Sequence, residues 1–147
     1  MGRKWTGLPE NYKKANPLAL AYLRLYTRQF YNYINPTLRN FCNHSNWLLF
    51  VQKMTPYINN AIWGLKCLDY FWDTTYRGIQ VKDNHITQNM FVRFQDFISS
   101  SHKQGSCFTP AGGGTLLVIK CKTGRQISKI SFYPNEEEVL FIREPLF

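Results

Sequence analysis

The stretch FYPNEEEVLF, residues 132–141, places three consecutive carboxylates directly before an apolar run that is typical of a β-strand. The chain of 147 residues carries a formal net charge of +9, and these three make up a third of its nine acidic residues. Side chains alternate between the two faces of a strand, so Glu136 and Glu138 should face one side and Glu137 the other. The spacing therefore predicts two carboxylates in one cleft.

Two polar segments precede this stretch, each within an expected strand. The first is YRG at residues 76–78, inside the run 74–79 of β-branched and aromatic character, and the second is FISSS at residues 97–101. In this order the chain resembles the arginine-specific mono-ADP-ribosyltransferases, which carry an Arg on one strand, a Ser-x-Ser on a second, and a Glu-x-Glu before a Val-Leu strand. The resemblance covers about residues 15–147, including the helical segment 20–39, which contains YT at 26–27 and IN at 34–35.

The resemblance implies a fold, a reaction and a set of residues on the NAD side of the site. We expect Arg77 to bind the pyrophosphate through its guanidinium fork and Gly78 to approach the nicotinamide carboxamide with its backbone. Glu138 would bind the ribose and stabilise the cationic transition state, with Ser99 orienting its carboxylate. Phe108 would flank the nicotinamide, although a place in the core is equally expected for it.

On the acceptor side, the resemblance assigns two residues. Glu136 would hold the guanidinium of an acceptor arginine and help to remove its proton, whereas relatives with Gln at this position favour other acceptors. Tyr133 would stack on that guanidinium, or else simply pack the loop. The sequence departs from the family pattern at Ser100, where Thr is frequent, and at Phe147, beyond which relatives usually continue for a further strand.

The helices are expected in the first half of the chain. Asn16-Pro17 is a helix-start signal, and we expect one helix over 18–34 that Asn35-Pro36 ends, followed by a short one through about residue 41. Residues 43–46 are predicted as a loop, and two further helices are expected over 47–54 and from Thr55-Pro56 to about residue 68.

The second half is rich in strand signals. Strands are expected over 74–79, 90–94, 97–100, 115–120 and 138–142. Helices followed by strands indicate an α+β fold, so we expect one domain over 1–147 in which a helical part (about 1–70) packs beside a two-sheet β core (about 71–147) with NAD in the cleft.

The charge distribution leaves a second partner class open. No acidic residue lies between Asn11 and Leu68, where seven Lys and Arg residues lie. A field of one sign attracts anions such as nucleic acid, acidic protein or anionic lipid head groups, although we favour a solvated helical face as the explanation of this charge. The same stretch supports nucleic acid as an alternative acceptor. We favour an arginine-presenting protein over nucleic acid, and we keep an inactive NAD-binding module of the same fold as the remaining alternative.

Several further expectations concern cofactors, cysteines and location. NAD, or NADP, serves as co-substrate, no metal is expected, and the protein should be a monomer. Cys42, Cys67, Cys107 and Cys121 permit two disulfides but do not require any. No hydrophobic segment reaches the length of a membrane span or a signal peptide, so a cytoplasmic location is the default, and a secreted one follows if the N-terminus is truncated.

Overall fold

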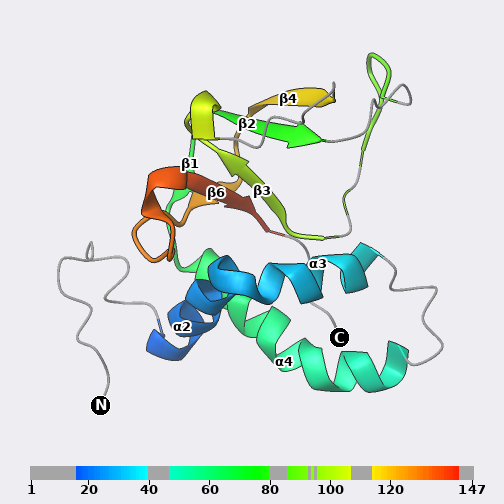
Figure 1. Ribbon diagram of the computed structural model, residues 1–147, viewed down its shortest axis with the longest axis vertical. Helices are drawn as coiled ribbons and strands as arrows, with labels where there is room; N and C mark the ends of the chain where they lie inside the picture. The colour runs from blue at the N-terminus through cyan, green and yellow to red at the C-terminus, as the bar shows by residue number, and fades with distance from the viewer. Residues whose placement is uncertain are drawn as a thin grey trace.

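The computed structural model describes residues 16–39, 47–79, 86–92, 94, 96–106 and 114–142. Its helical part comes first and consists of α2 (Pro17–Leu25), the π-helix η1 (Tyr26–Phe30), α3 (Tyr31–Arg39) and α4 (Trp47–Lys66). These helices form a layer on one side of the strands, as Figure 1 shows. The α+β prediction, with helices at the N-terminal end, is confirmed.

The first helical run, α2, η1 and α3 together, begins where the sequence predicts and continues to Arg39, beyond the expected end. Asn16 caps it, since its Oδ1 accepts from the Leu18 backbone N–H at 2.9 Å. The prediction that Asn35-Pro36 ends the helix is wrong, because α3 contains Pro36 and ends at Arg39. Proline removes one backbone hydrogen bond, and the burial of Ile34 and Leu38 on either side of it offsets this loss. The predicted loop at 43–46 lies outside the described residues.

The two helices expected on either side of Thr55-Pro56 are a single helix, α4. Pro56 lies on its exposed side, so the carbonyl of Gln52 that loses its partner can bond to water. The opposite face is fixed by burial of Ile58, Ile62 and Leu65. Gly64 lies where α4 crosses α2: a Cβ there would come within 2.8 Å of the Ala19 carbonyl oxygen, so the close crossing requires glycine.

The strands form one antiparallel sheet. They are β1 (Tyr70–Phe71), β2 (Thr74–Ile79), β3 (Ile98–Ser101), β4 (Thr115–Lys120), β5 (Gly124–Gln126) and β6 (Glu138–Phe141), in the order β1-β5-β6-β3-β2-β4. The expected two-sheet core is therefore corrected to a single sheet. Strands β2 and β4 pair with each other along six positions. They join the other four strands through a single register pair between β2 and β3, Tyr76 opposite Ser101.

Four of the five strand predictions are confirmed within one residue, and one is wrong. The strands over 74–79 and 115–120 are confirmed, and β3 and β6 differ from the expected bounds by one residue. The strand expected over 90–94 is wrong for the residues described there: Asn89 has a left-handed φ of 64°, and the Met90 N–H bonds to the Thr87 carbonyl, so a turn forms. The short strands β1 and β5 were not predicted.

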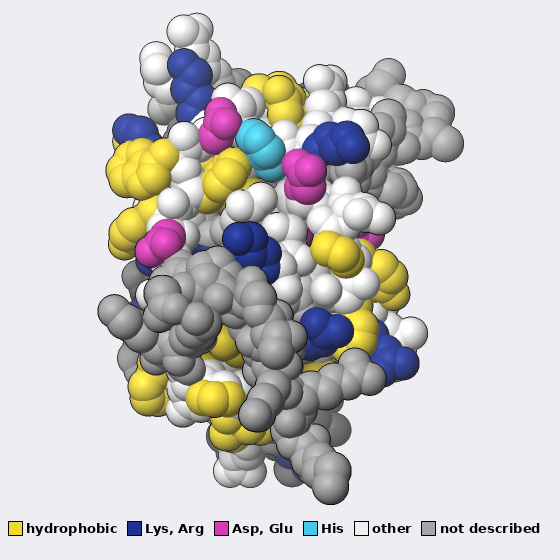
Figure 2. Space-filling view, turned by 90° about the vertical axis from the view of Figure 1, so that its left-hand side faces the viewer, with side chains coloured by type: hydrophobic (Ala, Val, Ile, Leu, Met, Phe, Trp, Pro, Cys, Tyr) yellow, Lys and Arg dark blue, Asp and Glu magenta, His cyan; other side chains and the backbone are white. Residues whose placement is uncertain are grey.

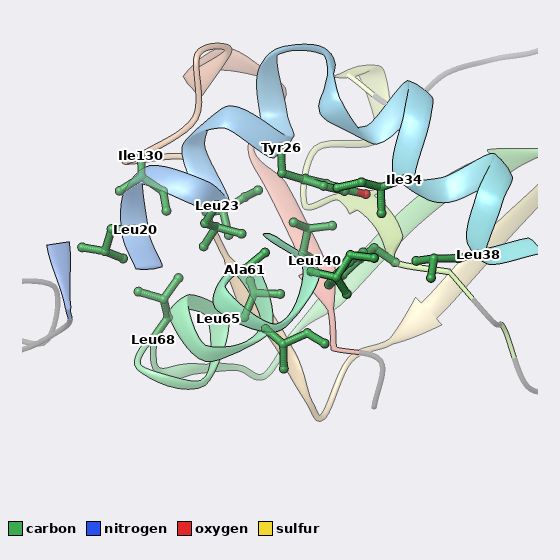
Figure 3. Packing of buried hydrophobic residues seen from close by; sticks show 14 residues of the cluster. Leu20, Leu23, Tyr26, Ile34, Leu38, Ala61, Leu65, Leu68, Ile130 and Leu140 are labelled. Atoms are coloured by element: carbon green, nitrogen blue, oxygen red, sulfur yellow. The ribbon is translucent and has the colours of Figure 1, made fainter. Parts of the chain in front are cut away.

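The core lies between the helices and the sheet. Figure 3 shows Leu140 of β6 beside side chains from α2 and α4, and Tyr26 above them. Phe97, which precedes β3, packs against Tyr26 with ring centroids 5.1 Å apart. This packing fixes β3 and β6 against the first helical segments, so residues from both parts can line a common cavity. Within the described ranges, no helix is long and apolar enough to cross a membrane.

Candidate active site

A cavity of about 470 Å³ opens between the helical layer and strands β2, β3 and β6. This volume is in the range of small-molecule sites. Six of the seven residues singled out from the sequence line it, and Phe108, the seventh, lies outside the described residues. The complete lining consists of Tyr26, Thr27, Tyr31, Asn35, Tyr76, Arg77, Gly78, Ser99, Ser100, Ser101, Tyr133, Glu136 and Glu138.

Glu138 and Ser99 are joined directly. The Ser99 hydroxyl donates to Glu138 Oε1 at 2.5 Å, the short distance of a charge-assisted hydrogen bond. In the antiparallel ladder Ser99 stands opposite Leu140 and Ser101 opposite Glu138, so the bonded pair are diagonal neighbours on one face. The sheet thus holds the carboxylate at the cavity wall, with 8% of the residue exposed.

Glu136 lies at the same cavity but reaches it through a different backbone shape from the one predicted. Residues 134–136 form the 3-10 helix η3, and Glu137 adopts a left-handed φ of 45°, so strand alternation does not apply before Glu138. The Glu136 carbonyl lies 2.7 Å from the Ser101 hydroxyl, and the Glu137 carbonyl accepts from His102 N–H at 3.0 Å. Glu136 is exposed, whereas Glu138 is buried.

The burial of Glu138 changes its acidity. Removal of the carboxylate from water raises the pKa of Glu138 from 4.5 to about 7, against the opposing effect of the Ser99 hydrogen bond. The neighbouring negative charge of Glu136 makes a smaller contribution to the same increase. Such a shift in a cleft is typical of functional carboxylates.

The raised pKa has a consequence for stability. Between pH 4.5 and about 7, the unfolded carboxyl group loses its proton while the folded one keeps it, so the free energy of unfolding falls as pH rises. Above about pH 7 the free energy of unfolding stays lower by the full amount, about 3 kcal/mol at 1.36 kcal/mol per pKa unit. We expect Glu138→Gln to be more stable than wild type by up to that amount at pH 8, with no difference below pH 4.5. Denaturant titrations at both pH values measure this, and a variant less stable at pH 8 would contradict it.

Arg77 projects from β2 and is half-buried at the cavity. Its Nη1 donates to the Ser99 carbonyl at 2.8 Å. This bond adds a link between β2 and β3, which share only one register pair. A guanidinium has five donors, so the side chain can serve the sheet and a ligand together. Gly78 follows on the same strand and leaves its backbone open to the cavity.

The helical wall contains site residues that sequence reasoning did not assign. Tyr26 and Asn35 are buried, and Asn35 Nδ2 donates to the Tyr26 hydroxyl at 2.9 Å. Burial is the main reason why the pKa of Tyr26 lies well above its usual range. Asn35 Oδ1 is buried and has no hydrogen-bond partner among the described residues, so it can accept from a ligand. Both residues fall in the segment that carries the resemblance, which was the available signal.

No cluster of three His, Cys, Asp or Glu side chains able to hold a metal occurs in the described ranges. Cys67 and Cys121 are free thiols, and Cys42 and Cys107 fall outside these ranges. On the face shown in Figure 2, basic, acidic and hydrophobic side chains are interspersed. This face therefore lacks a continuous basic surface in the described part of the chain.

A family model and a curated relative both match the sequence of this chain. The model of the family "NAD:arginine ADP-ribosyltransferase" matches residues 2–145. The T-cell ecto-ADP-ribosyltransferase 1 of Rattus norvegicus is 40% identical over 70 residues, which are 46% of this chain and 25% of the rat protein.

Solved structures of ADP-ribosyltransferases share the fold. The eukaryotic mono-ADP-ribosyltransferase ART2.2 superposes with a TM-score of 0.75 at 26% identity, over 88% of this chain and 57% of that one. A mutant of ART2.2 was solved in complex with NAD. HopU1 of Pseudomonas syringae superposes with a TM-score of 0.72 at 23% identity, over 89% of this chain and 68% of its own. The chain thus spans about a quarter of the rat protein and 57% of ART2.2.

Proposed function

The chain belongs to the NAD:arginine ADP-ribosyltransferase family, and from that premise we propose that it transfers ADP-ribose from NAD to arginine side chains of acceptor proteins and releases nicotinamide. The observation that carries this proposal is the pair of carboxylates at one cavity, Glu138 buried and bonded to Ser99, and Glu136 exposed at the rim. The different exposure suits two partners, a small molecule inside and a protein side chain outside.

Glu138 acts on NAD. As the bond between nicotinamide and ribose breaks, positive charge develops on the ribose, and a fixed carboxylate stabilises it. The Ser99 hydroxyl holds that carboxylate in place and favours its ionised form. Asn35 on the helical wall supplies an acceptor for a hydroxyl or amide of the same ligand. NAD is the substrate we propose, and use of NADP remains a prediction.

Glu136 acts on the acceptor. Its exposed carboxylate can accept two hydrogen bonds from an incoming guanidinium and take up a proton as the guanidinium nitrogen attacks the ribose. Tyr133, 50% exposed at the same rim, offers an aromatic face to that guanidinium. We name residues 127–137, which join β5 to β6 and contain both side chains, the acceptor loop.

Arg77 binds the NAD pyrophosphate in this proposal. Arg77→Lys keeps the charge but loses the planar fork, so the dissociation constant for NAD should rise by the equivalent of about 1 to 3 kcal/mol. Calorimetric titration of NAD into the folded variant measures this. Because Arg77 also donates to the Ser99 carbonyl, the thermal unfolding midpoint of the variant is measured in parallel. Unchanged affinity with reduced stability would assign Arg77 to the sheet alone.

The choice of acceptor tests the proposal. Polyarginine, polylysine and single-stranded DNA are offered separately with labelled NAD, and incorporated label is counted. Label in polyarginine alone is the expected result. Label in DNA would show that the protein ADP-ribosylates nucleic acid. NAD binding with no consumption of NAD under any condition would show that it is an inactive NAD-binding module.

A further inference from the structure

The acceptor loop is attached to the first helical segments by side chains other than the two cavity carboxylates. Arg24 of α2 donates from Nη1 to the Ile130 carbonyl at 3.2 Å. Its guanidinium carbon also lies 4.1 Å from the ring centroid of Phe132, and that of Arg28 lies 5.3 Å from the same ring. Two like charges are thus held at one aromatic ring in spite of their repulsion.

A second attachment runs through Thr27. Its hydroxyl accepts from the Phe132 backbone N–H at 3.2 Å and donates to the Arg24 carbonyl at 2.7 Å. Backbone groups of a loop have no ladder partners, so side chains must satisfy them where they are shielded from water. Here the helix side chains satisfy one carbonyl and one N–H of the loop, and Thr27 itself lines the cavity.

The attachment lies immediately before the residues proposed to handle the acceptor. Figure 3 shows Ile130 beside Leu20 at the α2 end of the core, and Ile130 is fully buried. After Phe132, the Tyr133 N–H bonds to the Ser131 hydroxyl at 2.9 Å, and η3 then leads directly to Glu136. The loop is therefore fixed to the helices through Ile130 and Phe132, and to Ser101 through the Glu136 carbonyl.

We infer that Arg24 and Thr27, with Phe132, are positioning residues that set the placement of Tyr133 and Glu136 and thereby the division between transfer to arginine and hydrolysis of NAD. The inference rests on the proposed function. Glu138 is held independently by Ser99 and by strand pairing. Displacement of the loop should consequently impair transfer and leave cleavage of NAD intact, because a small misplacement of a reacting group is costly.

The test compares Arg24→Met with Arg24→Lys and with the control Lys53→Met, which removes the same charge from an exposed position of α4. For each folded variant, transfer to agmatine and hydrolysis of NAD are measured separately. In Arg24→Met we expect kcat for transfer to fall about 10-fold or more, on the scale of a displaced catalytic group, with the KM for NAD unchanged and hydrolysis within about twofold. Arg24→Lys, which keeps a cation at Phe132, should recover part of the loss. Lys53→Met should match wild type.

Equal loss of both activities in folded Arg24→Met, or loss of neither, would overturn the inference. Should Arg24→Met not fold, Phe132→Leu removes the ring alone and carries the same expectation. Hydrogen exchange at the Phe132 amide provides a readout that does not need activity, and it should be faster in Arg24→Met than in wild type. A wild-type protein that consumes no NAD would refute the proposed function, and unchanged exchange would refute the attachment itself.

Discussion

Glu138→Gln is expected to lower both NAD hydrolysis and ADP-ribosyl transfer about 1,000-fold, on the scale of a lost electrostatic contact to the transition state. Glutamine keeps the shape of the side chain and can still accept from the Ser99 hydroxyl. It lacks the negative charge that a developing ribosyl cation requires. Release of nicotinamide, with and without agmatine, measures both reactions.

Glu137→Gln is the matched control for this variant. It makes the same chemical change at the adjacent residue, which is half-buried and is not among the residues that line the cavity. Near wild-type activity is expected there. A folded Glu138→Gln protein with wild-type turnover would remove Glu138 from the chemistry.

Glu136→Gln is expected to lower transfer to arginine about 100-fold, on the scale of lost general-base catalysis, and to leave NAD hydrolysis largely intact. The reason is its position: Glu136 is exposed at the rim, whereas Glu138 and Ser99 form a separate bonded unit within the cavity. Transfer to agmatine and hydrolysis are assayed on the same preparation.

The comparison between Glu136→Gln and Glu138→Gln carries more information than either variant alone. Since Glu136 also raises the pKa of Glu138, its neutralisation should lower that pKa and move the pH profile of hydrolysis to lower pH. Parallel loss of hydrolysis and transfer in Glu136→Gln would show that the two carboxylates do not have separate roles.

Local patterns in the sequence indicated most of the sheet, because β2 and β4 are short runs rich in β-branched residues, with an aromatic residue in β2 and leucines in β4. Proline signals were misleading in the helices. Pro36 and Pro56 each remove one backbone hydrogen bond, but burial of neighbouring apolar residues maintains α3 and α4 through them. Tertiary packing therefore overrode the local helix-ending signal of each proline, and a short window of sequence does not show that packing.

At the site, the three strand motifs pointed to Arg77, Ser99 and the two carboxylates because each motif is contiguous. The reason given for placing Glu136 beside Glu138 was wrong, since Glu137 turns the backbone through a left-handed conformation. The pair of Tyr26 and Asn35 was missed. Their contact bridges a π-helix and α3, and a π-helical segment has no reliable sequence signature.

Transfer to arginine is tested by incubating the protein with NAD and agmatine and quantifying nicotinamide, ADP-ribosyl-agmatine and free ADP-ribose together by mass spectrometry. We expect ADP-ribosyl-agmatine to account for most of the nicotinamide released, and free ADP-ribose to replace it when agmatine is omitted. Release of nicotinamide with free ADP-ribose as the only product, at any agmatine concentration, would contradict transfer to arginine.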